Sequence, residues 1–141
     1  MMIKNLVKLT VCTLLISNPL LPKNKSFQEG VILFKEKKFK EAKFKFEQEI
    51  VINPKSELSY LYLSEIFKNL DKKKLQENNL NTVILLNPNN EEATFNLAKL
   101  KLENSDYKKS KELNDKLSLF CKKLCDESKK LKNKIENLSK K

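Results

Sequence analysis

Three cysteines carry the most distinctive chemistry in this 141-residue sequence, and two of them, Cys121 and Cys125, lie four residues apart. At that spacing the two sulfurs can form a disulfide, and a turn between them favours closure more than a continuous helix does. Two other states fit the same spacing. The thiols can be reduced and buried, or they can bind a metal, although two cysteines in a chain without histidine make a poor zinc site. Of these three states we predict the disulfide, because an even pair of cysteines in an exported protein suggests one. A redox-active pair would favour the shorter Cys-x-x-Cys spacing.

The sequence contains no recognisable catalytic set. It has no histidine, the commonest general base, and its single glycine rules out a glycine-rich phosphate loop. Serine and threonine hydroxyls therefore have no histidine to activate them. Glu47, Glu49, Glu91 and Glu92 lie among lysines at helical spacings, so we interpret them as members of surface ion pairs. The sequence thus predicts a protein that is not an enzyme and that needs no cofactor or metal.

The charge is strongly basic. All 29 basic residues are lysine, which against 18 acidic residues gives a net charge of +11, and the excess is greatest after Cys121. One interpretation is that the lysines cover solvated faces of helices. The other is attraction to phosphate or to anionic lipid. Because arginine, the main base-reading side chain, is absent, the sequence disfavours nucleic acid as a partner.

The N-terminus is typical of a targeting segment. Residues 1–22 contain two lysines and no acid, and residues 9–21 form an uncharged, mostly apolar run. That run is shorter than the roughly 20 apolar residues needed to span a bilayer, but it fits the apolar core of a signal peptide. The alternatives are an uncleaved membrane anchor and a lipid-modified Cys12. We therefore expect export to the periplasm or cell envelope of a bacterium, with Cys121 and Cys125 left as an even pair.

The remainder of the sequence repeats with a period of 34 residues. The segment Ile50–Pro54 (IVINP) recurs as Ile84–Pro88 (ILLNP), and in both the proline stops an apolar run. Small residues follow the same period at Gly30, Ser64 and Ala98. The period divides the chain into three copies, which are residues 23–56, 57–90 and 91–124.

Each copy contains two apolar stripes at helical spacing. In the first copy Phe27, Val31 and Phe34 form one stripe, and Ala42 and Phe46 belong to the next, after a short polar break. The small residue in each first helix lets the second helix pack closely against it. No alternating pattern typical of strands is sustained. The sequence therefore predicts an all-α chain in which every copy is a pair of helices.

These positions resemble the signature of the tetratricopeptide-repeat family. The residues that carry the resemblance, over the three copies, are Gly30, Ala42, Phe46, Pro54, Ser64, Pro88, Ala98 and Tyr107. The third copy is degenerate, because Lys122 stands where the closing proline would be. The resemblance covers about residues 23–124 and implies three tandem helix-turn-helix repeats that form a short right-handed solenoid.

The lysine-rich residues 125–141 follow the third copy. An apolar stripe begins at Leu124, and within it Leu131 and Ile135 fall where a fourth copy would place its apolar pair. We expect a C-terminal helix that covers the exposed face of the last repeat, as stacked repeats require. The alternative is one unbroken helix across residues 107–138.

The resemblance also implies a function. In this family the first helices of successive repeats line a concave surface that often receives a segment of a protein partner. The residues expected on that surface are Gln28, Val31, Lys35, Tyr62, Glu65, Asn69, Asn96, Lys99 and Glu103. The alternative is a solvated inner face with no ligand. We therefore predict a small non-enzymatic adaptor or scaffold that binds a protein or peptide.

A second hypothesis for the function belongs to a different class. The lysine-rich C-terminal helix could attach the protein to anionic lipid, as a peripheral membrane protein, or to nucleic acid. The two hypotheses differ in their salt dependence, since electrostatic attachment weakens steeply as salt rises.

Overall fold

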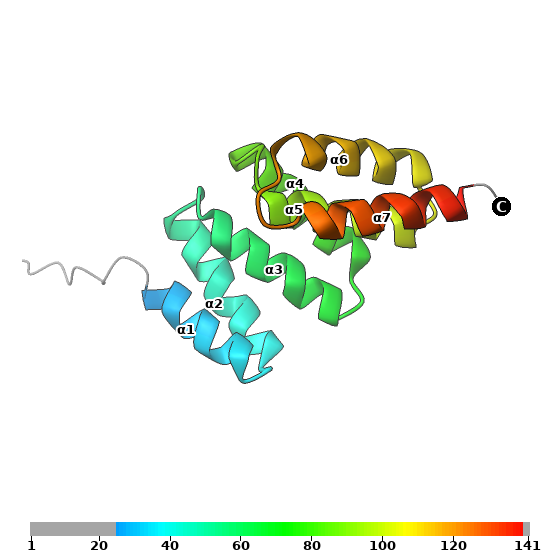
Figure 1. Cartoon of the computed structure of the whole chain (residues 1–141). Helices are drawn as coiled ribbons and strands as arrows, with labels where there is room; N and C mark the ends of the chain where they lie inside the picture. The colour runs from blue at the N-terminus through cyan, green and yellow to red at the C-terminus, as the bar shows by residue number, and fades with distance from the viewer. Residues whose placement is uncertain (1–24, 140–141) are drawn as a thin grey trace, which may run out of the picture.

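The structure, a computed structural model, describes residues 25–139. Over this range it consists of seven α-helices and contains no strand, which confirms the all-α prediction (Figure 1). The helices are α1 (Lys25–Lys35), α2 (Phe39–Ile52), α3 (Glu57–Asn69), α4 (Lys73–Leu86), α5 (Glu91–Glu103), α6 (Tyr107–Phe120) and α7 (Cys125–Leu138). No helix in the described range has the length and apolar character needed to cross a membrane. The predicted targeting segment, residues 1–22, and Cys12 within it lie outside the described residues.

The helices form three hairpins followed by a single helix. α1 packs on α2, α3 on α4 and α5 on α6, and each hairpin contacts the next through α2 and α3 or α4 and α5. Figure 1 shows the hairpins stacked along the molecule, with α7 laid beside α5 and α6. The predicted solenoid of three helix pairs and a C-terminal helix is therefore confirmed.

The alternative of one unbroken helix from residue 107 to residue 138 is wrong. α6 ends at Phe120, because Cys121 has an extended backbone with φ −60° and ψ 145°. A second helix begins at Cys125, so residues 121–124 form a connecting loop. This break lets α7 fold back across the last hairpin.

Each hairpin turns at a residue with a left-handed backbone. These residues are Lys37, Asp71 and Ser105, with φ of 59°, 52° and 59°, and they are spaced by the 34-residue period. In every turn the N–H of the following residue donates to the carbonyl oxygen five residues earlier, at 2.8–2.9 Å. This hydrogen bond is typical of a Schellman turn, in which the residue with the left-handed backbone is usually glycine. The chain builds three such turns without glycine.

The core has two parts that meet along the stack. The N-terminal part consists of Ala42, Phe46, Leu63, Ile66 and Phe67. The C-terminal part extends from α4 to α7 and consists of Leu80, Val83, Ala93, Leu97, Ala98, Leu100, Leu102, Leu113, Leu131 and Ile135. Because Leu131 and Ile135 of α7 are buried in it, α7 covers the last hairpin as expected.

The residues of the repeat signature occupy contact positions between helices. Gly30, Ala42, Phe46, Ser64 and Ala98 are buried, and Tyr107 is half-buried. Pro54 and Pro88 are exposed and stand just after α2 and α4. Gly30 lies against the ring of Phe46 in α2, and the carbonyl oxygen of Ala98 accepts the hydroxyl of Ser110 in α6 at 2.8 Å, so these two small residues lie at the contact between the helices of a hairpin.

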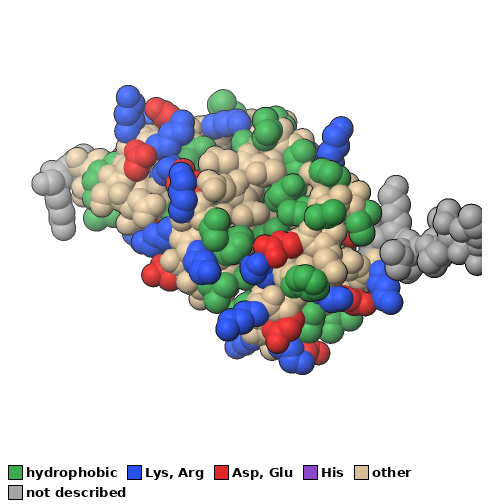
Figure 2. Space-filling model, turned by 180° about the vertical axis from the view of Figure 1, so that it is seen from behind, with side chains coloured by type: hydrophobic (Ala, Val, Ile, Leu, Met, Phe, Trp, Pro, Cys, Tyr) green, Lys and Arg blue, Asp and Glu red, His purple; other side chains and the backbone are tan. Residues whose placement is uncertain are grey.

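The C-terminal ends of the second helices leave aliphatic side chains in solvent. Val51, Leu85 and Leu119 occupy the same register position in α2, α4 and α6, and they are 80%, 82% and 86% exposed. Seen from behind, the surface shows hydrophobic side chains interspersed with charged ones (Figure 2). The helices that follow therefore leave these three positions uncovered.

Candidate functional site

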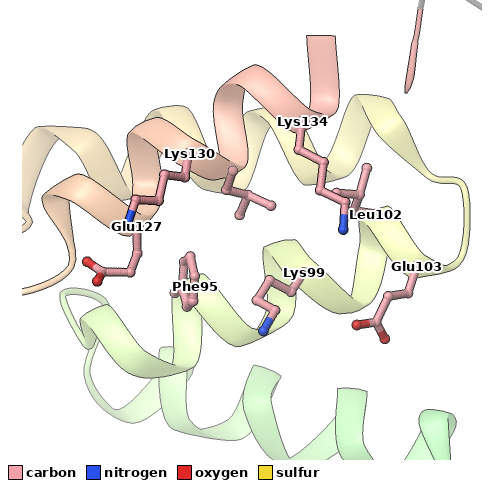
Figure 3. A pocket seen from close by; sticks show the side chains of 8 residues that line it. Phe95, Lys99, Leu102, Glu103, Glu127, Lys130 and Lys134 are labelled. Atoms are coloured by element: carbon pink, nitrogen blue, oxygen red, sulfur yellow. The ribbon is translucent and has the colours of Figure 1, made fainter. Parts of the chain in front are cut away.

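Two hollows are lined by the first helices of the hairpins and by α7. The N-terminal hollow, of about 220 Å³, lies between α1, α3 and α5 and is lined by Phe34, Leu58, Leu61, Tyr62, Glu65 and Glu92. The C-terminal hollow, of about 210 Å³, lies between α5 and α7 and is lined by Phe95, Lys99, Leu102, Glu103, Glu127, Lys130, Leu131 and Lys134 (Figure 3). Both hollows use α5.

One face of α5 connects the two hollows. Glu92, Phe95, Lys99 and Glu103 follow one another at intervals of three and four residues, so they share one side of the helix. Glu92 lines the N-terminal hollow, and the other three line the C-terminal hollow. With a rise of about 1.5 Å per residue, this row is roughly 16 Å long. The two hollows can therefore act as one surface.

Tyr62 is held by three aromatic rings. It stacks on the buried Phe46 with ring centroids 4.8 Å apart and an interplanar angle of 6°. Phe34 and Phe27 meet it edge to face, at 5.1 Å and 5.9 Å between centroids. Because these arrangements are the favourable ones for aromatic pairs, the half-buried ring is fixed before any ligand arrives. The N-terminal hollow is thus preformed around Tyr62.

The C-terminal hollow combines an apolar base with three lysines. Leu102 and Leu131 are buried, and the half-buried Phe95 lies between them and solvent. The Nζ atom of Lys99 lies 5.5 Å from the centroid of the Phe95 ring, within the range of a cation–π contact. Figure 3 shows Lys130 and Lys134 extending from α7 on the other side of the same space. Glu103 and Glu127 lie at its edges.

Most lysines of residues 25–139 form no ion pair, and the three lysines of the C-terminal hollow are among them. Nine lysines place Nζ 2.6–3.9 Å from a carboxylate oxygen. Over residues 25–139, Lys99, Lys130 and Lys134 form no such pair, although two glutamates line the same hollow. Their charge is therefore open to an anion from outside.

Four of the nine residues expected on the concave surface line these hollows. Tyr62 and Glu65 line the N-terminal hollow, and Lys99 and Glu103 line the C-terminal hollow. The other five line neither of the two, and they are Gln28, Val31, Lys35, Asn69 and Asn96. Of these, Asn69 donates its side-chain amide to the carbonyl oxygen of Glu65 at 2.8 Å.

Sequence reasoning missed the contribution of α7 to this surface. We interpreted that helix as a cap, and the structure shows that it also supplies Glu127, Lys130 and Lys134 to the C-terminal hollow. A signal for this was present, because Leu131 and Ile135 stand two periods of 34 residues after Leu63 and Phe67, which lie in a first helix. A helix that occupies that position presents one side to the same surface as the first helices do.

The interpretation of four glutamates as members of surface ion pairs is wrong for three of them. Glu47 does pair with Lys43, at 2.7 Å. Glu49, in contrast, is 2% exposed, and Glu91 accepts hydrogen bonds from backbone groups instead of lysine side chains. Glu92 is exposed and lines the N-terminal hollow, but it pairs with no lysine among residues 25–139. Local spacing could not reveal these environments, because they depend on contacts about 30 residues away or between hairpins.

Glu91 fastens the loop between α6 and α7. Its carboxylate accepts the N–H groups of Lys122, Lys123 and Leu124, each at 2.9 Å. The N–H of Leu124, followed by that of Lys123, holds the pKa of Glu91 below its ordinary value, although partial burial opposes this. The loop is thereby tied to the start of α5, which sets where α7 begins.

The second hairpin contains an equivalent contact. Glu57, at the start of α3, stands 34 residues before Glu91 and accepts the side-chain amides of Asn87, at 3.1 Å, and Asn90. Asn90 also caps α5, since its side-chain oxygen accepts the N–H of Ala93 at 2.7 Å. A glutamate at the start of a first helix thus fixes the start of the next first helix in both places.

Cys121 and Cys125 stand at the two ends of the α6–α7 loop. Their Sγ atoms lie 2.13 Å apart as a disulfide, and their Cα atoms are 5.4 Å apart, inside the usual range for a bridge. Among residues 25–139 no cluster of three or more histidine, cysteine, aspartate or glutamate side chains could hold a metal ion. Two constraints therefore act on this loop, the cysteine bridge and the hydrogen bonds to Glu91.

Comparison with known proteins identifies the fold through solved structures. No protein-family model matches the sequence, and no curated protein has a significant match. Among solved structures, the TPR2B domain of yeast Sti1 in an Hsp70 complex is similar at a TM-score of 0.75 and 16% identity, over 82% of this chain and 97% of that one. The Sgt2 TPR domain from Aspergillus fumigatus follows at 0.72 and 17%, over 87% and 85% of the two chains.

A bacterial secretion chaperone has the same architecture. SycD of Yersinia enterocolitica, in complex with a peptide of the translocator YopD, is similar at a TM-score of 0.73 and 11% identity, over 84% of this chain and 94% of that one. At these identities the likeness concerns the fold. The chain therefore has the tetratricopeptide-repeat fold, and the resemblance in the sequence is confirmed at that level.

Proposed function

We propose that this protein is a non-enzymatic adaptor that holds an extended segment of a protein partner across the N-terminal and C-terminal hollows. The observation that carries the proposal is the row of side chains on α5 that joins the two hollows. At about 3.3 Å per residue, an extended segment of about five residues covers this row. SycD, which has the same fold, is known in complex with a translocator peptide, and a TPR of RPAP3 is known bound to an HSP90 peptide.

The rigidity of the N-terminal hollow supports this use. A partner segment loses less free energy on binding when the receiving side chains are already ordered. Tyr62 is fixed by its contacts with Phe46, Phe34 and Phe27, so it can receive an apolar side chain without rearranging. Three hairpins offer a limited area, and we expect moderate affinity or assembly on a larger partner.

Site-directed crosslinking tests the adaptor hypothesis. A photoreactive amino acid is placed at Glu92, on the row between the hollows, and in a control at Lys40, which is exposed on α2. We expect the Glu92 variant alone to crosslink a defined partner segment in native cells. A synthetic copy of that segment should then bind the purified protein and compete with crosslinking. Equal crosslinking from both positions, or no binding by the synthetic segment, would contradict the proposal.

Export to the periplasm or envelope is the second part of the proposal. It rests on the composition of residues 1–22 and on the cysteine pair, since disulfides persist in oxidising compartments. Intact-mass measurement of protein purified from native cells tests both points. We expect loss of a segment near residues 1–22 and a mass two hydrogens below that of the reduced remainder. Full-length, fully reduced protein in the cytoplasmic fraction would contradict export.

Attachment through α7 is the competing function. Four exposed lysines support it, and these are Lys129, Lys130, Lys132 and Lys134. However, α7 buries Leu131 and Ile135 against the last hairpin, so it has no apolar face to insert into lipid. Attachment would then be electrostatic alone. Binding to phosphatidylglycerol vesicles or to DNA that falls steeply with salt would favour attachment, and salt-insensitive binding of a peptide would favour the adaptor.

A further inference from the structure

We infer that a pocket beside the N-terminal hollow binds a positively charged side chain, lysine or arginine, of the partner segment. This acidic pocket has a volume of about 420 Å³ and is lined by Phe27, Glu49, Ser56, Glu57 and Leu58. It lies where α2 ends and α3 begins, and α1 contributes the phenylalanine. The inference rests on the proposed function, since it names the chemistry of one residue of the segment that the adaptor would hold.

Glu49 occupies a position that is apolar in the other two hairpins. It stands one period of 34 residues before Val83 and two periods before Leu117, each in the second helix of its hairpin. Because Val83 and Leu117 are fully buried, this position belongs to the core. Glu49 is 2% exposed, and it is the only acidic or basic side chain buried among residues 25–139. A carboxylate at a core position costs stability unless a partner compensates it, and such departures from a pattern are expected at functional sites.

No described residue compensates the carboxylate of Glu49. It forms no ion pair within residues 25–139, and Lys45, four residues earlier on α2, pairs with Glu29 at 2.6 Å instead. The carboxylates that accept hydrogen bonds in this range do not include it. Since no side-chain oxygen of this range is both fully buried and without a hydrogen bond, the Glu49 oxygens open into the pocket that the residue lines. A buried side chain thus presents a free carboxylate to a ligand.

Glu57 brings a second carboxylate to the acidic pocket. The side-chain amides of Asn87 and Asn90 both donate to its Oε1 atom, and Oε2 accepts no hydrogen bond within the described range. The lining contains these two acidic side chains and no basic one. In a pocket partly shielded from water, two carboxylates attract a cation more strongly than they do on an open surface.

The lining favours an organic cation over a metal ion. Calcium takes roughly six to eight oxygen ligands, and residues 25–139 contain no cluster of three or more side chains that could hold a metal ion. Phe27 and Leu58 instead offer an apolar surface along which the stem of a lysine or arginine can lie. The ring of Phe27 is already fixed, because it meets Phe46 and Tyr62 edge to face at 5.8 Å and 5.9 Å between centroids.

The acidic pocket continues the surface that the adaptor offers. Leu58 lines both this pocket and the N-terminal hollow, so one extended segment can reach from one to the other. The charged residues of the N-terminal hollow, Glu65 and Glu92, are acidic as well. We therefore expect the basic residue of the segment at the end opposite to the C-terminal hollow.

A small probe tests the pocket without a partner. Nα-acetyl-lysine amide is titrated into isotopically labelled protein and followed by NMR, with Nα-acetyl-norleucine amide as the neutral control. We expect the lysine probe alone to shift the amide signals of Phe27, Glu49 and Leu58. Glu49→Gln should weaken its binding about tenfold or abolish it. Glu41→Gln, which removes an exposed carboxylate of the same helix, should leave binding unchanged.

The stability of a second variant separates a binding role from a structural one. Glu49→Leu introduces the side chain that Leu117 provides in the third hairpin. We expect this variant to have a higher Tm than the wild type and no probe binding, because the core gains apolar contacts while the pocket loses a carboxylate. The matched control, Glu41→Leu, should change Tm little, since that position is exposed.

A displayed library of random ten-residue peptides connects the pocket to a partner. We expect peptides selected on the wild type to be enriched in lysine or arginine and to bind Glu49→Gln about tenfold more weakly. If the lysine probe binds Glu49→Gln as tightly as the wild type, the pocket is wrongly assigned, and the adaptor hypothesis survives if peptides still bind. If the probe binds but no peptide does, the adaptor hypothesis fails and the inference fails with it.

Two other occupants would overturn the inference. If calcium shifts the same signals at a lower concentration than the lysine probe, the pocket is a metal site. The other occupant is Lys23 of the chain itself, which stands 34 residues before Glu57 in the sequence. If Glu49→Leu and Lys23→Gln lower Tm equally, the two side chains form a structural pair and the pocket is not free for a partner.

Discussion

The ring of Phe46 occupies the space that a side chain on Gly30 would need. Its Cε1 atom lies 2.9 Å from the position of a β-carbon built on that glycine, closer than such contacts ordinarily come. Phe46 is fully buried and stacks on Tyr62, so it cannot move without disturbing the N-terminal hollow. The only glycine of the chain therefore connects the packing of α1 on α2 with the shape of the candidate site.

Replacing Gly30 by alanine should destabilise the protein. Two effects oppose each other, because alanine favours a helix over glycine by about 1 kcal/mol while overpacking a filled core costs about 1–3 kcal/mol. We expect the clash to prevail, since the ring lacks free space, and the free energy of unfolding to fall by about 1–2 kcal/mol. Urea denaturation measures the change.

A double-mutant cycle with Phe46→Leu isolates the clash. Phe46→Leu alone removes ring contacts and destabilises the protein, but it also frees the space beside residue 30. In that background Gly30→Ala should cost little or should stabilise, because the helix preference of alanine then acts alone. A Gly30→Ala variant that is more stable than the wild type with Phe46 in place would contradict the reasoning.

Glycine should stabilise the turns of the hairpins. A side chain in the left-handed region costs about 1 kcal/mol, and glycine avoids that cost. Lys37→Gly and Ser105→Gly should each raise the free energy of unfolding by about 0.5–1 kcal/mol. Asp71→Gly should gain less, since aspartate tolerates this region better than most residues. Thermal unfolding monitored by circular dichroism provides the measurement.

The matched control for the turn variants is a glycine inside a helix. Lys116 is exposed in the middle of α6 and forms no ion pair within residues 25–139. Lys116→Gly should lower the free energy of unfolding by about 1 kcal/mol. The change from lysine to glycine should thus raise the free energy of unfolding at residue 37 and lower it at residue 116. Destabilisation at both would mean that the left-handed turn is not what Lys37 adopts in solution.

The hairpins could be predicted because their determinants repeat. Asn-Pro at residues 53–54 and 87–88 stops two helices 34 residues apart, and small residues recur at the helix contacts with the same period. The third hairpin lacks its proline, but Ala98 is fully buried as expected. The end of its second helix, α6, is instead set by the extended backbone of Cys121 and by the hydrogen bonds of the loop to Glu91. These bonds join residues about 30 positions apart, so a local sequence pattern cannot predict them.

The candidate site was predicted in part for a related reason. Periodicity identifies the helices that line it, and it correctly places Tyr62 and Lys99 on the lined face. The residues that enclose a hollow depend on the distances between neighbouring helices, which periodicity does not give. Lys130 lines the C-terminal hollow because α7 folds back beside α5. The left-handed turns were missed because lysine and serine there give no turn signal of the kind that glycine gives.

Neutralising Glu91 should destabilise the protein at neutral pH. The pKa of Glu91 is lowered by backbone N–H groups of the loop, so its stabilising effect is present above the ordinary carboxyl pKa and is lost as the pH falls through the lowered value. Glu91→Gln should have a lower Tm than the wild type at pH 7. The difference should shrink as the pH falls below the ordinary carboxyl pKa of about 4.5.

Glu112→Gln serves as the comparison for Glu91. The pKa of Glu112 is also lowered, but through the side chain of Lys109 on the exposed surface of α6. Exposed pairs contribute little to stability, because water screens them. We expect Glu112→Gln to leave Tm almost unchanged at every pH. An equal effect of the two substitutions would show that the α6–α7 loop does not depend on Glu91.

The last prediction concerns the cysteine bridge at the same loop. A bridge that encloses only residues 121–125 restricts the unfolded chain less than a long one does, so Cys121→Ser with Cys125→Ser should cost at most about 2 kcal/mol. Its local effect should be larger, because the loop sets the start of α7 and thus one wall of the C-terminal hollow. Hydrogen exchange should speed up at residues 124–128 and remain unchanged in α1–α3. Reduction of the wild type should reproduce this pattern, and reductant should not affect the double variant. A wild type that shows two reactive thiols before reduction would contradict the bridge, and Glu91 alone would then hold the loop.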